Sequence, residues 1–135
     1  MEYATLGNTG LMVSKLCFGT MTFGDGRGLF KAISGVGQAE ADQLVKTSID
    51  GGINFFDTAD NYTEGESERI LGQSLKNLNI ARQDVVIATK VYSRVGPGRN
   101  DVGLLGATLW TVWRPVSCVC RPTISTCTRS MPTIP

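Results

Sequence analysis

The chain has 135 residues, of which 41% are hydrophobic and 19% are charged, and its net charge is +1. This composition is typical of a globular protein, and it argues against intrinsic disorder and against a nucleic-acid or polyanion partner. No apolar run has bilayer-spanning length and the N-terminus lacks the pattern of a secretory signal, so we expect a cytoplasmic protein without a membrane partner.

The first elements along the chain are short strands. Residues 3–6 and 11–14 flank a Gly-Asn-Thr-Gly turn, which predicts a β-hairpin. Leu16–Gly19 is mostly apolar and predicts the first strand of a sheet, with Cys17 as a buried apolar residue within it. Residues 24–37 are rich in glycine and predict an irregular loop.

Two amphipathic helices and two further strands follow. Residues 40–50 and 66–78 carry apolar residues at helical spacing, and a Gly-Gly pair at 51–52 ends the first helix. Ile53–Phe56 and Val85–Thr89 are short and apolar, as is typical of strands covered on both faces. The alternation of strands and helices predicts an α/β fold with a parallel sheet.

Ionisable residues stand where two of these strands end. Asp57 follows the second sheet strand and Lys90 follows the third, so both belong to the edge where parallel α/β folds keep their chemistry. Tyr62 comes five residues after Asp57, close enough to turn back over the strand end. On residue types alone, a solvated Asp–Lys ion pair beside a surface tyrosine remains the alternative.

Three motifs resemble the aldo-keto reductases. Gly52–Gly72 (GINFFDTADNYTEGESERILG) resembles the signature of that family, Leu6–Met21 (LGNTGLMVSKLCFGTM) its N-terminus and Ala88–Val91 (ATKV) its third strand. The three motifs agree with the family in order and spacing and cover roughly residues 1–103. The resemblance implies a (β/α)8 TIM barrel that reduces small carbonyl compounds with NADPH.

The resemblance also implies roles for single residues. Asp57, Tyr62 and Lys90 correspond to members of the family's catalytic set, with Tyr62 as the proton donor. A phenol with an ordinary pKa of ~10 is a poor acid, and a neighbouring cation such as Lys90 would help it to ionise. The remaining member of the set is a histidine, and this chain contains none.

The family resemblance places the nicotinamide end of the cofactor beside Gly19, Thr20, Met21 and Asp57. The sequence contains neither a GxGxxG fingerprint nor a Walker A pattern. That absence does not exclude NADP(H), because the family holds its cofactor on the barrel.

The length of the chain limits what it can form. A complete barrel takes about 250 residues, so we expect an N-terminal fragment of about three βα units after the hairpin. The third strand would then be an unpaired edge, and we expect the chain by itself to be inactive. The alternative function is a non-catalytic remnant or a cofactor-binding module. The oligomeric state is not predicted.

The composition changes after Gly103. Residues 104–135 contain both tryptophans and no Asp, Glu or Lys, and they lack helical or strand periodicity. We therefore expect a barrel part at 1–103 and a non-homologous, disordered tail at 104–135. Cys118, Cys120 and Cys127 match no common zinc spacing, so we predict no metal site.

A shifted reading frame would explain the change in composition after Gly103. With suitable synonymous codons, the stretch from Ala107 can be read as HIMDGVEASLL followed by RLQTDYIDLYQIHANDT. This reading is amphipathic, then strand-like, and it includes the missing histidine. Our hypothesis is a frameshift: a base was lost near Gly103, in the gene or in its sequencing.

Overall fold

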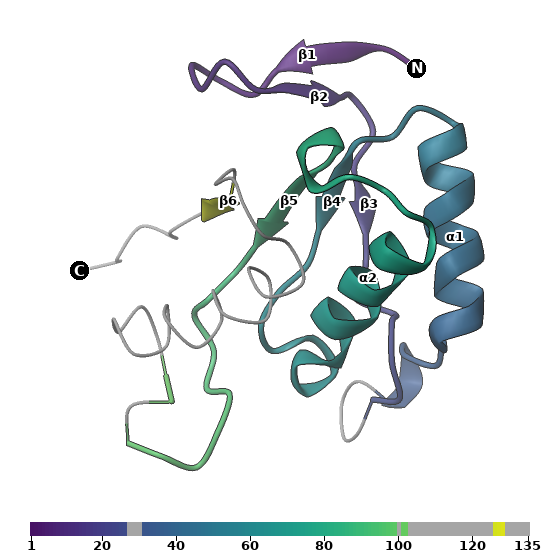
Figure 1. The fold of residues 1–135 in the computed structure, drawn as a ribbon. Helices are drawn as coiled ribbons and strands as arrows, with labels where there is room; N and C mark the ends of the chain where they lie inside the picture. The colour runs from purple at the N-terminus through teal and green to yellow at the C-terminus, as the bar shows by residue number, and fades with distance from the viewer. Residues whose placement is uncertain (27–30, 100, 103–125, 129–135) are drawn as a thin grey trace.

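The computed structural model describes residues 1–26, 31–99, 101–102 and 126–128. Its centre is a parallel sheet in the strand order β3-β4-β5-β6, with two helices packed on one side of it (Figure 1). The predicted α/β architecture with a parallel sheet is confirmed. The strands of the sheet are β3 (Phe18–Gly19), β4 (Phe55–Asp57), β5 (Val86–Thr89) and β6 (Thr126–Thr128).

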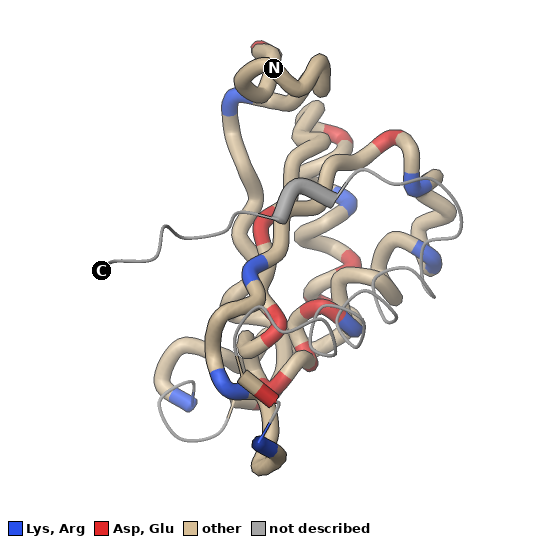
Figure 2. Tube along the Cα trace, turned by 90° about the vertical axis from the view of Figure 1, so that its left-hand side faces the viewer, with Lys and Arg blue, Asp and Glu red and all other residues tan. Residues whose placement is uncertain are grey.

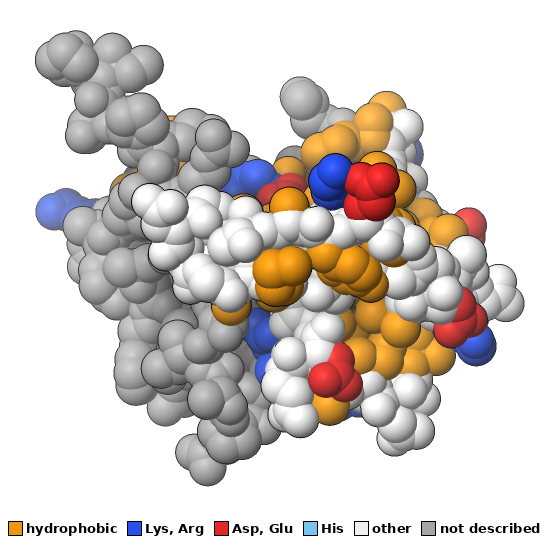
Figure 3. Space-filling model, turned by 90° about the horizontal axis from the view of Figure 1, so that it is seen from above, with side chains coloured by type: hydrophobic (Ala, Val, Ile, Leu, Met, Phe, Trp, Pro, Cys, Tyr) orange, Lys and Arg blue, Asp and Glu red, His pale blue; other side chains and the backbone are white. Residues whose placement is uncertain are grey.

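The N-terminal hairpin lies across the end of the sheet at which its strands begin (Figure 1). Strands β1 (Tyr3–Thr5) and β2 (Met12–Ser14) pair antiparallel. Asn54, just before β4, accepts a hydrogen bond from the Ser14 backbone N–H at 2.8 Å and donates one to the Met12 carbonyl at 3.0 Å. Figure 3 views this end, where hydrophobic side chains reach the surface.

Both predicted helices are present. Helix α1 (Gln38–Asp50) joins β3 to β4, and α2 (Glu66–Asn77) joins β4 to β5. Short 3-10 turns, η2 (Tyr62–Gly65) and η3 (Arg82–Asp84), precede and follow α2. The buried positions of α2 recur at helical spacing, so one stripe of the helix faces the sheet. They are Ser67, Ile70, Leu71, Gly72, Ser74 and Leu75.

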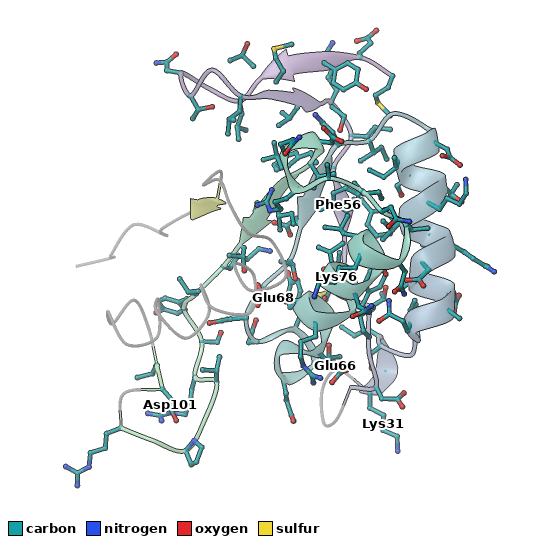
Figure 4. The ribbon with its side chains drawn as sticks, in the orientation of Figure 1. Lys31, Phe56, Glu66, Glu68, Lys76 and Asp101 are labelled. Atoms are coloured by element: carbon teal, nitrogen blue, oxygen red, sulfur yellow. The ribbon has the colours of Figure 1, made fainter. Side chains whose placement is uncertain are left out.

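The hydrophobic core fills the space between the sheet and the helices. Phe56 of β4 is fully buried, and its ring lies 5.8 Å from that of Phe18 on β3 (Figure 4). Phe23, also fully buried, packs against Phe18 with the ring centroids 5.9 Å apart. Around these rings lie the remaining buried members of the core: Ala41, Val45, Ile70, Leu71, Leu75, Val85 and Ile87.

Two sequence predictions are wrong. Strand β5 is not an unpaired edge, because β6 runs parallel to it with Ile87 opposite Thr126 and Thr89 opposite Thr128. An edge strand exposes unpaired N–H and C=O groups that can bind any extended segment, and here β6 pairs with them. Cys17 is exposed, because its neighbour Phe18 points to the helix side and successive side chains alternate.

The remainder of the predicted tail, residues 104–125 and 129–135, lies outside the described residues. Its assignment as a separate, disordered segment therefore stays a prediction. Within the described part of the chain, no helix has the length and apolar character needed to cross a bilayer.

Replacing Phe56 with alanine tests the position of the core. Phe56→Ala is expected to lower the free energy of unfolding by about 3–5 kcal/mol, because it empties a fully buried site. Leu16→Ala removes a side chain that is 60% exposed and should change stability by no more than about 0.5 kcal/mol. Urea unfolding of both variants measures the difference, and equal losses would contradict this placement of the core.

Candidate active site

Strand register opens a space around Asp57. Its Cα partners are Gly19 on β3 and Ala88 on β5, two residues with little or no side chain. Apart from its two chain neighbours, no described residue has an atom within 4 Å of the place where a Cβ of Gly19 would stand. Because side chains alternate along a strand, Asp57 points away from the face on which Phe56 meets the helices. Asp57 therefore stands on the open face of the sheet.

Lys90 brings the three predicted catalytic residues together. Its ammonium donates hydrogen bonds to Asp57 Oδ2 at 2.6 Å and to the Thr58 carbonyl at 2.9 Å. A third hydrogen bond runs from Nζ to Tyr62 Oη at 3.2 Å, and Nζ lies 4.8 Å from the centroid of the Tyr62 ring. An ammonium has three N–H donors, so all of them are used.

The surroundings of Lys90 favour its charged form. Burial alone would lower the pKa of Lys90, but the hydrogen bonds and charge interactions with Asp57 and Tyr62 together outweigh burial and raise the pKa above its ordinary value. A fixed positive charge therefore stands beside the phenol oxygen at neutral pH. The side chains of Asp57 and Lys90 are each 37% exposed, so a small molecule can approach this group from solvent.

A strained turn holds Tyr62 over the strand end. The two residues after it, Thr63 (φ 47°) and Glu64 (φ 59°), both adopt left-handed conformations that are uncommon outside glycine. Such residues cost roughly 1–3 kcal/mol each and persist where the surroundings hold them. Here the Thr63 hydroxyl donates a 2.6 Å hydrogen bond to the Phe23 carbonyl inside the core. The turn that carries Tyr62 is therefore anchored to the core.

The residues expected at the nicotinamide end differ in accessibility. Gly19, the last residue of β3, is exposed and lies opposite Asp57, and Met21, two residues further along the chain, is 40% exposed. Thr20 is fully buried: its backbone N–H donates to the Asp57 carbonyl at 3.0 Å, and its hydroxyl shares a 2.8 Å hydrogen bond with that of Ser67. A ligand would reach Thr20 only after a local rearrangement.

The sequence analysis missed two carboxyl groups near this site, that of buried Asp60 and that of half-buried Glu68. Asp60 is only 6% exposed, and its Oδ2 has no hydrogen-bond partner among the described residues. Burial raises the pKa of Asp60 and also that of Glu68, whose Oε1 accepts a 2.6 Å hydrogen bond from the Thr89 hydroxyl. Thr89 could have indicated the position of Glu68, since a polar residue inside a buried strand needs a hydrogen-bond partner.

The three cysteines of the predicted tail lie mostly beyond the described residues. Cys118 and Cys120 are outside them, and Cys127 belongs to β6. The described part of the chain contains no group of three or more side chains suited to hold a metal ion. Charges of both signs are interspersed along it (Figure 2).

Comparison with known proteins agrees with this fold. The model of the aldo/keto reductase family matches residues 15–106, which is more than half of the chain. The chain belongs to the aldo/keto reductase family. The match ends close to Gly103, where the composition of this family member changes.

Named relatives of this aldo/keto reductase chain differ in what their names describe. A probable voltage-gated potassium channel subunit beta of Arabidopsis thaliana is 41% identical over 77% of the chain and 29% of its own length. Versiconal hemiacetal acetate reductase of Aspergillus parasiticus is 42% identical over 74% of the chain and 28% of its own length. The chain thus spans less than a third of the length of these relatives.

Solved structures show the same fold. An aldo-keto reductase of Bacillus halodurans in its holo form matches 87% of the chain and 37% of its own length, with a TM-score of 0.64 and 28% identity. A putative aldo-keto reductase from Pseudomonas aeruginosa matches 95% of the chain and 47% of its own length, with a TM-score of 0.65 and 28% identity. The described fold is therefore part of a (β/α)8 barrel.

Asp60 is expected to make the protein less stable as the pH rises. Because its folded pKa is raised, the folded state holds the proton more tightly, and stability falls between the unfolded pKa of ~3.9 and the higher folded pKa. Asp60→Asn should therefore be more stable than the parent at pH ~7 but not at pH ~3.

The free energy of unfolding in urea, measured at both pH values, tests this expectation. Asp50→Asn is the matched control, since Asp50 lies on the exposed face of α1 and forms an ion pair with Lys46. It should leave the pH dependence of the parent nearly unchanged. A parallel pH profile for Asp60→Asn and the parent would show that ionised Asp60 carries no burial cost.

Proposed function

We propose that residues 1–103 form the proton-donating part of an oxidoreductase that reduces a small aldehyde or ketone with NADPH. One observation carries the proposal: the Lys90 ammonium binds the Asp57 carboxylate and the Tyr62 phenol oxygen at the open edge of a parallel sheet. In α/β barrels this edge is where catalytic residues gather. The catalytic assignment of Asp57, Tyr62 and Lys90 is part of this proposal.

Carbonyl reduction needs a hydride at carbon and a proton at oxygen. The hydride is the chemistry that a reduced nicotinamide supplies when it is bound. Tyr62 donates its hydroxyl proton to the oxygen that becomes the alcohol, which leaves a phenolate on the protein. Lys90 stabilises the negative charge on that phenolate, and Asp57 holds the ammonium in place. Each of the three residues therefore has a separate task.

Gly19, Met21 and Asp57 are the residues that would hold the nicotinamide end. The space beside Gly19 supports this, because a flat ring can approach the backbone there without meeting a side chain. Thr20 supports the same edge from within, through its hydrogen bonds to Asp57 and Ser67. The Bacillus halodurans relative was solved in its holo form, which agrees with a cofactor-binding family.

A second candidate function is a non-catalytic cofactor-binding module or remnant. Two relatives at 41% and 40% identity are named as probable potassium channel subunits, not as reductases. The chain also spans only 29% of each of them. Under this proposal the ammonium, phenol and carboxylate would serve binding without turnover. A cytoplasmic location belongs to both proposals.

The chain alone is expected to give no NADPH-dependent reduction of an aldehyde panel. The residues described here supply one side of the site, whereas full-length relatives are about three times as long. Loss of NADPH absorbance measures reduction, and fluorescence titration with NADPH measures binding. Turnover by the chain alone would contradict the expectation. Tight binding without turnover would favour the module.

A chimaera tests the catalytic assignment. Residues 1–103 would replace the matching N-terminal part of the Bacillus halodurans enzyme, and the folded chimaera should oxidise NADPH with an aldehyde. Tyr62→Phe in the chimaera should lower kcat by about 10²–10⁴-fold, because the general acid is removed. Tyr92→Phe is the matched control, since Tyr92 is 70% exposed. Equal rates in the two variants would refute Tyr62 as the donor.

A further inference from the structure

Thr89, the residue before Lys90, links the end of β5 to helix α2. It is the last residue of β5, is only 3% exposed, and donates its hydroxyl to Glu68 Oε1 at 2.6 Å. Glu68 lies in the first turn of α2 and Figure 4 shows it beside the strand ends. Because side chains alternate, Thr89 faces the helix while Lys90 turns toward the open face.

The backbone of this strand end is fixed on its other side by the segment after β4. The Thr58 N–H donates to the Ala88 carbonyl at 2.8 Å, and the Asp60 N–H donates to the Lys90 carbonyl at 3.1 Å. Main-chain hydrogen bonds thus hold the β4 side. On the helix side, the side-chain hydrogen bond from Thr89 to Glu68 holds the strand end. Together with the pairing of β5 to β6, these two sets of hydrogen bonds fix the backbone from which the Lys90 side chain extends.

Glu68 also interacts electrostatically with Lys90. Burial raises the pKa of Glu68, the Thr89 hydrogen bond lowers it, and smaller opposing effects come from the Asp60 carboxyl and the Lys90 ammonium. An attraction that favours ionised Glu68 equally favours the charged form of Lys90. The titratable groups around Lys90 are Asp57 from β4, Asp60 and Tyr62 from the following loop and turn, Glu68 from α2 and Cys17 from the segment before β3.

We propose that Glu68 is a positioning residue for Lys90, acting through the Thr89 hydroxyl and through its own negative charge. The carboxylate fixes the end of β5 against α2 and adds a second acidic group behind the Asp57–Lys90 pair. The purpose of this support rests on the proposed role of Lys90 beside Tyr62. The contact itself does not depend on that role, so the two proposals can fail separately.

The test is the pKa of Lys90, measured by NMR titration of the complete 135-residue chain carrying 13C-labelled lysine. Glu68→Gln should lower the Lys90 pKa, but by less than the loss of the direct partner does. Asp57→Asn, which removes the direct partner, should lower it by ~1 unit or more. Glu66→Gln is the matched control: it lies in the same helical turn, forms an ion pair with Arg69 instead, and should leave the Lys90 pKa unchanged.

Variants of Thr89 separate the hydrogen bond from the charge. Thr89→Val removes the hydroxyl and should raise the pKa of Glu68, whereas Thr89→Ser keeps the hydroxyl and should restore it. Circular dichroism identifies any variant that does not fold. If Glu68→Gln does not fold, the two Thr89 variants test the proposal instead. The Lys90 resonances should then shift in Thr89→Val and return to the parent positions in Thr89→Ser.

An unchanged Lys90 pKa in folded Glu68→Gln, alongside a lowered one in Asp57→Asn, overturns the proposal. The positioning role is equally overturned if Thr89→Val and Thr89→Ser leave the Lys90 resonances unperturbed. If the Lys90 pKa falls as expected but the chimaera shows no reductase activity, the positioning role stands and the proposed function fails.

Discussion

The ammonium of Lys90 joins the end of β5 to residues 57–62, the short segment that ends β4 and begins η2. It binds a carboxylate at the end of β4, a backbone carbonyl in the loop after it and a phenol oxygen on η2. Partial burial makes such a charge costly unless its donors are paired, and here all three are. The geometry of the open edge therefore depends on this one group, and its neighbours are arranged to keep it charged.

Strand register makes that arrangement possible. Pairing Asp57 with Gly19 on one side and Ala88 on the other leaves the carboxylate without bulky neighbours. A shift of one residue would instead place Phe18 and Ile87 beside Asp57 and turn its side chain toward the helices. The core contacts of Phe56 oppose such a shift, because its fully buried ring occupies the helix side of the sheet. Core packing and site geometry are thus set by the same pairing.

Buried Asp60 and half-buried Glu68 connect the helix side of the sheet to the open side. Glu68 reaches the strand end through Thr89, and Asp60 reaches it through its backbone. Burying ionisable groups opposes folding, so we interpret these carboxyl groups next to Lys90 as support for the site and not as a source of stability. The strained turn at Thr63 and Glu64 fits the same view, since it places Tyr62 at an energetic cost.

The sequence alone determined the architecture and the central residues. Apolar runs ending in Asp57 and Lys90, with Tyr62 shortly after the first, were enough to predict a parallel sheet with a polar edge, because strand and helix periodicity is local. The family resemblance then added roles for these residues, and the comparisons confirm the family.

Only the tertiary structure decided the features that depend on pairing between distant segments. The addition of β6 to β5, the exposure of Cys17 and the burial of Asp60 all follow from which strand or helix covers which face. The contact of Glu68 with Thr89 joins residues 21 positions apart. No local pattern encodes such contacts, because they arise from strand register and from the side of the sheet on which the helices pack.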